Sequence, residues 1–191
     1  MKRKGRIFVL SSPSGAGKTT VLKRLKKERF NIRYSVSATT RRRRSGERNG
    51  ADYIFLNRAE FERRIREKRF LEWTDNFGNL YGTPKGFVEE TVSKGEDIVL
   101  SIDVKGAMQV RGAYDSGALL IFLVAPNFSL LKERLSKRKT EDKRSLAKRL
   151  KVAKKELTYL NKYDYVIVND SLVKAVSALK SILTAERHKV K

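Results

Sequence analysis

The segment RIFVLSSPSGAGKTTVL, residues 6–22, carries the residues best spaced to bind a polyphosphate. Gly15 and Gly17 let the backbone curl without a Cβ near an anion. Such a turn directs successive N–H groups at a phosphate, and the helix that follows adds its partial positive charge. Lys18 can reach the outer phosphates, and the Thr19 hydroxyl is placed to ligate magnesium. The segment therefore predicts a nucleotide-binding loop between a strand and a helix.

This loop departs from the strict pattern G-x-x-x-x-G-K-[ST], because Ser12 stands at the first glycine position. Serine is small and compatible with a turn, so we expect the loop to form. The alternative is a strand–turn–helix corner with a stray lysine, but the apolar run before the turn favours a nucleotide site. The residues predicted to bind the nucleotide phosphates are Ser12, Pro13, Ser14, Gly15, Ala16, Gly17, Lys18, Thr19 and Thr20.

Length and composition exclude several classes of protein. The 191 residues suffice for one domain with a core, with room for inserted subdomains. No apolar run approaches the roughly 20 residues of a membrane helix, and the N-terminal apolar run is too short for a secretory signal. The absence of cysteine excludes disulfides and thiolate metal sites and fits a cytoplasmic location. His188, the only histidine, lies in a polar tail, which argues against a histidine base.

The net charge of +23 indicates attraction to anions. Nucleotides, nucleic acid and acidic surfaces all satisfy that condition. Bulk charge does not choose among them, so the choice depends on the geometry of particular sites.

The order of apolar and amphipathic segments predicts the fold class. Strands are expected at 7–10, 98–103, 119–124 and 165–168, and helices at 18–30, 85–93, 127–137 and 143–157, with a helical turn at 106–111. This alternation predicts a three-layer α/β fold whose parallel sheet is covered on both faces, with sites at the carboxyl ends of its strands. Residues 34–83 differ, because short strands surround one helix at 58–68 and suggest an inserted mixed-β subdomain.

A second group of polar residues could bind another phosphate. The segment 39–55 reads Thr39-Thr40-Arg41-x-x-Arg44-x-x-Glu47-x-x-Gly50-x-x-Tyr53-x-Phe55. Two arginines three residues apart can both donate to a single phosphate, and Tyr53 and Tyr81 can add hydroxyl donors. The alternative for the four consecutive arginines is a solvated basic loop, which is what most charge runs are.

Together with the phosphate loop, these residues make the chain similar to guanylate kinases. The resemblance covers nearly the whole chain and includes Ser35-Val36-Ser37, the spacing above, Phe70-Leu71-Glu72-Trp73, Gly78-Asn79-x-Tyr81-Gly82-Thr83, Asp103 with Gly106, and Val168-Asn169-Asp170. It implies a core domain of residues 1–33, 84–125 and 157–191, a GMP-binding subdomain of residues 34–83, and a helical lid of residues 126–156.

The resemblance also implies roles at the GMP site. Arg41, Arg44, Tyr53 and Tyr81 would hold the GMP phosphate. Glu72 would accept hydrogen bonds from guanine, and Ser37 and Thr83 would read its other polar edge, with Asp103 completing the set. Adenine has no donor at N1, so a buried carboxylate facing it would lack a partner, at a cost of about 1–3 kcal/mol.

The implied reaction transfers the γ-phosphoryl group of ATP to GMP, and to dGMP, with magnesium bound through ATP and Thr19. Lid residues Arg134, Arg138 and Arg149 would approach the phosphates, and Asn169 the adenine. The acceptor is already an anion, so no strong general base is needed. The residues expected to be catalytic are Lys18, Arg41, Arg138 and Arg149.

The chain departs from the family pattern at Ser101 as well as at Ser12, and three alternatives stay open. Ser101 stands where the family commonly has the first aspartate of an Asp-x-Asp pair, so Asp103 must act alone or take another role.

The chain could instead be a non-catalytic guanylate-kinase-like binding module, a basic nucleic-acid-binding protein, or a kinase for another nucleoside monophosphate. The intact Lys18-Thr19 pair argues against the first, and the lack of a recognisable binding module against the second. We expect no membrane and no specific nucleic-acid partner; the sequence identifies no protein partner.

Overall fold

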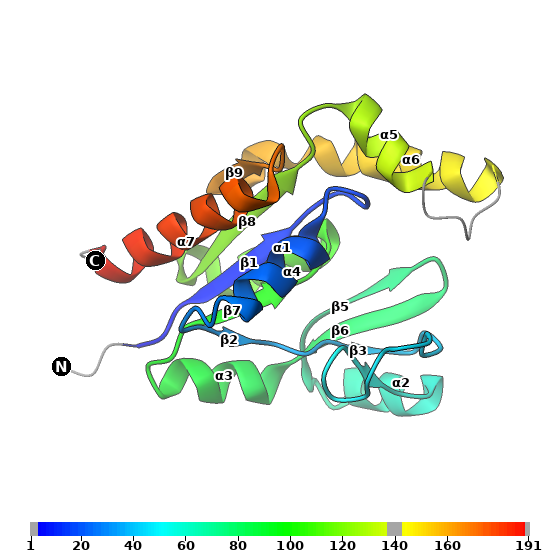
Figure 1. Ribbon diagram of the computed structural model, residues 1–191. Coiled ribbons are helices and arrows are strands. Elements are labelled where there is room, and N and C mark those ends of the chain that lie inside the picture. Colours follow the sequence, from blue (N-terminus) through cyan, green and yellow to red (C-terminus); the bar gives the residue numbers. More distant parts are fainter. Residues whose placement is uncertain (1–3, 137–142, 190–191) are drawn as a thin grey trace. The chain divides into compact units, whose positions relative to one another are not determined.

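The computed structural model describes residues 4–136 and 143–189, and Figure 1 labels its helices and strands. Arg138 lies outside the described residues. Within the two described ranges, no helix combines the length and the hydropathy that crossing a bilayer requires.

A five-stranded parallel sheet contains the most deeply buried strands. Its order is β2-β7-β1-β8-β9, and the strands are β1 (Ile7–Ser11), β2 (Arg33–Tyr34), β7 (Ile98–Ser101), β8 (Ala118–Val124) and β9 (Tyr165–Val168). β2 runs parallel to β7, and β8 runs parallel to β9. All of β1 is buried, as expected for a strand with both faces covered. The predicted α/β class with a parallel sheet is confirmed.

A smaller sheet forms within residues 34–84. Its order is β4-β3-β6-β5, and the strands are β3 (Ala38–Thr39), β4 (Ile54–Phe55), β5 (Phe70–Asn76) and β6 (Asn79–Pro84). β3 is parallel to β4 and antiparallel to β6, so the sheet is mixed, as predicted. A separate core fills one face, where the rings of Phe61 and Phe70 stack with centroids 4.4 Å apart.

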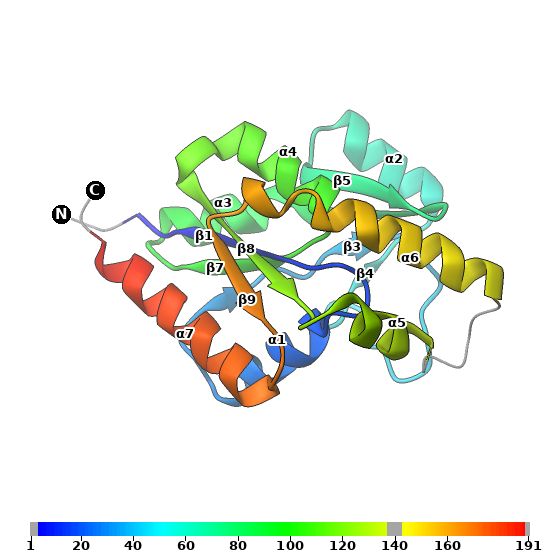
Figure 2. The same cartoon turned by 90° about the horizontal axis from the view of Figure 1, so that it is seen from above.

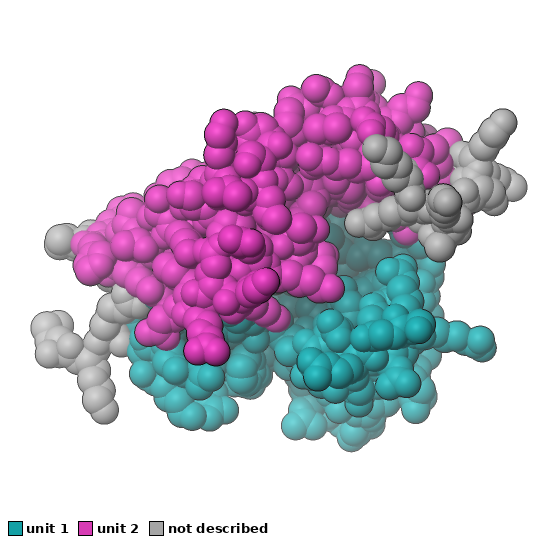
Figure 3. All heavy atoms as spheres, in the orientation of Figure 1, with its two compact units in different colours: residues 1–9, 32–118 teal, residues 10–31, 119–191 magenta. Residues whose placement is uncertain are grey.

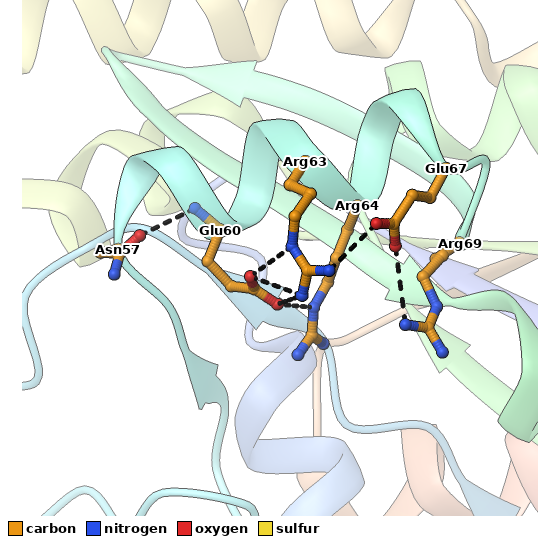
Figure 4. Close-up of polar contacts among 6 residues, drawn as sticks. All are labelled: Asn57, Glu60, Arg63, Arg64, Glu67 and Arg69. Carbon is orange, nitrogen blue, oxygen red and sulfur yellow. Dashed lines mark hydrogen bonds and ion pairs between the residues drawn. The ribbon is translucent and has the colours of Figure 1, made fainter.

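The helix over this core, α2 (Arg58–Arg66), balances much of its own charge. The Asn57 side chain accepts the Glu60 N–H at 2.8 Å and caps the helix. Glu60 pairs with Arg63 and Arg64, and Glu67 pairs with Arg63 and with Arg69, which lies beyond the end of the helix. Figure 4 draws this network among Asn57, Glu60, Arg63, Arg64, Glu67 and Arg69. Exposed pairs of this kind are screened by solvent, so they support the helix only modestly.

The helix α4 (Val104–Tyr114) is longer than the helical turn predicted at 106–111. The Asp103 side chain accepts the Gly106 N–H at 2.8 Å and caps the helix, so β7 ends at Ser101 rather than at 103. Val104, Ala107 and Val110 are buried at a helical spacing of three residues. The other helices are α1 (Lys18–Lys27), α3 (Lys85–Ser93), α5 (Phe128–Ser136), α6 (Lys143–Leu157) and α7 (Leu172–His188).

The chain divides into two compact units, which Figure 3 colours separately. One comprises residues 1–9 and 32–118 and contains the mixed sheet with α2, α3 and α4. The other comprises residues 10–31 and 119–191 and contains α1, α5, α6 and α7. Within this second unit α1 and α7 lie side by side (Figure 2), and Lys180 of α7 pairs with Glu28 at the end of α1.

Candidate nucleotide sites

The predicted phosphate loop joins β1 to α1 in the second unit and has the backbone that its glycines allow. Gly15 and Gly17 have φ values of 91° and 99°, in the left-handed region where a side chain is strained. Ser12 has no positive φ, which explains why a serine is tolerated in place of the glycine of the strict pattern. The N–H groups of Thr20 and Val21 both donate to the Gly17 carbonyl, so α1 begins directly after the loop.

Two side chains from elsewhere in the sequence hold the loop through the carbonyl oxygen of Ala16. The Asn169 amide nitrogen donates to the Ala16 carbonyl at 2.7 Å, and Arg134 Nη1 approaches the same oxygen at 3.5 Å. Arg134 Nη2 also donates to the Asn169 carbonyl at 3.3 Å. Asn169 is 6% exposed, and a Cβ on Gly17 would lie 2.4 Å from its amide nitrogen. Two residues predicted to contact ATP therefore contact the loop backbone.

Apolar side chains of α5 and α6 also pack against the loop. Ala16 belongs to a buried cluster with Leu131 and Leu135 of α5 and Ala153 of α6. A Cβ on Gly15 would lie 2.9 Å from Leu135, so this glycine is also required by close packing. The two helices of the predicted lid thus pack against the loop within one unit. Arg149 lies half-buried on α6.

In the first unit, three of the four predicted phosphate ligands, Arg41, Tyr53 and Tyr81, lie together. Arg41 Nη2 pairs with Glu47 Oε1 at 2.7 Å, and its side chain is only 13% exposed. The guanidinium lies 5.3 Å from the centre of the Tyr53 ring, which meets the Tyr81 ring edge-on at 6.0 Å. The hydrogen bond from Arg41 lowers the pKa of the Glu47 carboxyl, and burial raises the pKa of the Tyr53 hydroxyl.

Glu47 was not among the predicted site residues, although it lies between them in sequence. Its second oxygen, Oε2, accepts the Arg44 backbone N–H at 2.8 Å, so one carboxylate joins Arg41 to Arg44. The Arg44 side chain is exposed. The signal that could have identified Glu47 is its spacing, six residues after Arg41 and three after Arg44.

Two of the predicted guanine-reading residues, Glu72 and Thr83, lie opposite each other on the β5–β6 hairpin. Glu72 and Thr83 are paired across the strands and are 4% and 0% exposed. The Thr83 hydroxyl donates to Glu72 Oε1 at 2.7 Å. Ser37 precedes β3, and its carbonyl accepts the Ile54 N–H at 2.9 Å. A buried carboxylate with one oxygen bonded to Thr83 is suited to accept hydrogen bonds from a ligand.

Asp103 is occupied by protein contacts on both of its oxygens. Oδ1 accepts the Gly106 N–H, and Oδ2 accepts the Thr74 hydroxyl at 2.8 Å and the side-chain amide of Asn76. These bonds tie the start of α4 to β5. Thr74 and Asn76 were not predicted to be near the site, and only the register of the hairpin identifies them.

The family model for guanylate kinase matches residues 4–186. The chain belongs to the guanylate kinase family. The guanylate kinase of Carboxydothermus hydrogenoformans is 46% identical over 98% of this chain and 92% of its own length. That of Thermotoga maritima is 43% identical over 98% and 90%. Among solved structures, the crystal structure of guanylate kinase from Anaplasma phagocytophilum is 37% identical, with a TM-score of 0.84, and the match covers 99% of this chain and 89% of that one.

In this member of the guanylate kinase family, replacing Asn169 by alanine should weaken ATP binding about tenfold to a hundredfold. The reason is that the Ala16 carbonyl loses its buried donor, at a cost of about 1–3 kcal/mol, and the loop is no longer held. Inhibition by inorganic tripolyphosphate, which has no base, should weaken by the same factor. Asn161→Ala, at an exposed position, is the control and should change neither. A loss confined to ATP would place Asn169 at the adenine and contradict a role in holding the loop.

Glu47→Gln should lower the free energy of unfolding by about 1 kcal/mol at pH 7, because the pair with Arg41 loses its negative charge. The pKa of Glu47 is lowered in the folded state, chiefly by the hydrogen bond from Arg41. Its contribution is therefore complete above the unfolded pKa of about 4.3 and is lost as the pH falls through the folded pKa.

Urea unfolding of both proteins at pH 7, 5 and 3.5 measures this dependence. The difference between parent and Glu47→Gln should be equal at pH 7 and 5 and smaller at pH 3.5. Glu62→Gln, which removes an exposed carboxylate paired with Arg58, is the control and should cost under about 0.5 kcal/mol at pH 7. A Glu47→Gln difference that persists unchanged to pH 3.5 would show that the charge of Glu47 is not responsible.

Proposed function

We propose that this chain transfers the γ-phosphoryl group of ATP to GMP, and to dGMP, giving ADP and the nucleoside diphosphate. The observation that carries the proposal is the buried pair of Glu72 and Thr83, in a chain that matches guanylate kinases along nearly its full length. A buried carboxylate selects a base that offers hydrogen-bond donors, and guanine offers two on one edge.

ATP is assigned to the loop between β1 and α1. The loop N–H groups and Lys18 would bind its phosphates, and Arg134, Arg138 and Arg149 are assigned to approach them. The conformation of Gly15 and Gly17 supports this assignment. The observed contacts of Arg134 and Asn169 with the loop indicate that these two residues also hold the loop in shape.

GMP is assigned to the first unit. Arg41, Arg44, Tyr53 and Tyr81 would bind its phosphate, because Arg41 and the two rings already lie together. Glu72, Thr83 and Ser37 would bind the base, with Asp103 adjacent through Thr74. Glu47 would keep Arg41 in place until the phosphate arrives. The division into a core (1–33, 84–125 and 157–191), a GMP-binding subdomain (34–83) and a lid (126–156) is part of the same proposal.

The chemistry needs positioning and positive charge rather than a base. The attacking group is a phosphate oxygen, and the transferred group passes through a charged, in-line transition state. Lys18 would stabilise the charge on the ATP phosphates, while Arg41 would hold the acceptor, and Arg138 and Arg149 are assigned to the transferring group. Closing of the predicted lid would exclude water and suppress ATP hydrolysis.

Magnesium fits the residues around the loop. The described ranges contain no group of three or more His, Asp or Glu side chains that could hold a metal by themselves. Magnesium bound with a nucleotide takes most of its ligands from phosphates and water, so a single hydroxyl such as the exposed Thr19 is sufficient. When bound, the ion would neutralise charge on the ATP phosphates. A cytoplasmic location remains a prediction from the sequence.

An acceptor panel tests the function. ADP release should be measured with GMP, dGMP, AMP and UMP, and we expect kcat/KM for GMP to exceed that for AMP and UMP by at least about a hundredfold. A preference for AMP or UMP would identify a different nucleoside monophosphate kinase. Absence of turnover with every acceptor would favour a binding module, and tight duplex binding at physiological salt would favour a nucleic-acid-binding protein.

Lys18→Ala should lower kcat by at least about a hundredfold, because the charge on the ATP phosphates loses its nearest side-chain cation. The Tm should stay close to that of the parent. Lys23→Ala, on the exposed face of the same helix, is the matched control and should keep full turnover. Near-parental turnover in Lys18→Ala would remove this residue from the mechanism.

A further inference from the structure

Gly106 lies buried in the first turn of α4, directly against the carboxylate of Glu72. A Cβ built on Gly106 would lie 2.3 Å from Glu72 Oε2 and 2.9 Å from its carboxyl carbon. Both distances are shorter than a carbon atom tolerates. Gly106 has no positive φ, so its backbone would accept any residue. The glycine is therefore required by the space that the carboxylate occupies.

Moving the strand away would break hydrogen bonds, because β5 is tied to α4 on both sides of Gly106. On one side, Gln109 Nε2 donates to the Trp73 carbonyl at 2.8 Å, and the Trp73 N–H donates to Gln109 Oε1 at 3.2 Å. On the other side, the Asp103 carboxylate accepts the side chains of Thr74 and Asn76. A side chain at position 106 must therefore displace the carboxylate of Glu72.

That carboxylate is also bound by Thr83, across the hairpin. Its Oε1 accepts the Thr83 hydroxyl, and Oε2 is the atom nearest to Gly106. Displacing Oε2 rotates or withdraws the whole group, so both oxygens leave the positions from which they can accept hydrogen bonds from a base. The carboxylate keeps its negative charge, but its oxygens are no longer placed to bind the base.

We propose that Gly106 is a positioning residue for base recognition, because its lack of a side chain places the Glu72 carboxylate where guanine is read. This inference rests on the proposed function, in which Glu72 binds the base of GMP. It adds Gly106 of α4, which has no side chain, to the residues that determine which base is bound.

The test is Gly106→Ala, with Gly112→Ala as the matched control. Both substitutions place alanine in the same helix, where alanine is normally favoured over glycine. A Cβ on Gly112 would meet nothing within 4 Å. We expect Gly112→Ala to match the parent in every kinetic constant. Gly106→Ala should keep its Tm within about 5 °C of the parent, because only the end of one side chain has to move.

Gly106→Ala should raise the KM for GMP about tenfold to a hundredfold, as expected when a hydrogen bond to a charged group is misplaced. The KM for ATP should not change. The preference for GMP over inosine monophosphate, which lacks the exocyclic amine, should fall. Adding Gly106→Ala to Glu72→Gln should cost less than about twofold more, because both changes then act through one side chain.

Two results would overturn the inference. One is a KM for GMP within twofold of the parent in Gly106→Ala. The other is an equal further loss when Gly106→Ala is added to Glu72→Gln, which would show that Gly106 acts through something other than this carboxylate. A parent protein that does not phosphorylate GMP would instead refute the proposed function, so the two failures are distinguishable.

Discussion

The carbonyl oxygen of Ala16 needs a hydrogen-bond donor, because the residue is fully buried. Asn169 and Arg134 supply the donors, and this fixes the peptide between Ala16 and Gly17. A loop that binds anions through its N–H groups works only if its carbonyl groups are turned away and satisfied elsewhere. The shape of the phosphate loop therefore depends on residues from α5 and from the end of β9.

In the other unit, too, a polar group that needs hydrogen-bond partners fixes the positions of the elements around it. The carboxylate of Asp103 caps α4 and accepts two side chains of β5, so helix and strand are joined at a fixed distance. Glu72 then occupies the space between them. The pairing register shifts between Phe70 and Glu72, as in a β-bulge. This shift lets Phe70 pack into the apolar core while Glu72, two residues later, contacts Thr83 on the other face.

Local patterns in the sequence predicted what depends on local chemistry. The phosphate loop, the parallel sheet, the mixed sheet and the approach of Arg41 to Tyr53 follow from residue types and short spacings. What could not be predicted depends on distant partners. Asn169 and Ala16 are 153 residues apart, so the adenine role expected for Asn169 could not be weighed against a role in holding the loop. The register shift before Glu72 has no clear signature in the residues FLEW.

The large positive charge is explained by these contacts only in part. A net charge of +23 attracts anions of every kind and raises their local concentration without distinguishing among them. Arg58 illustrates this, because its pair with Glu62 leaves 60% of the side chain exposed. Arg41 differs, since Glu47 and the Tyr53 ring hold its guanidinium in one orientation with 13% of the side chain exposed. A cation held in this way is already oriented before a ligand binds, so binding a phosphate does not cost the entropy of ordering that side chain. Selection among anions therefore depends on the few cations that neighbouring residues hold in place. The remaining positive charge raises the rate at which anions reach the protein, but it does not select among them.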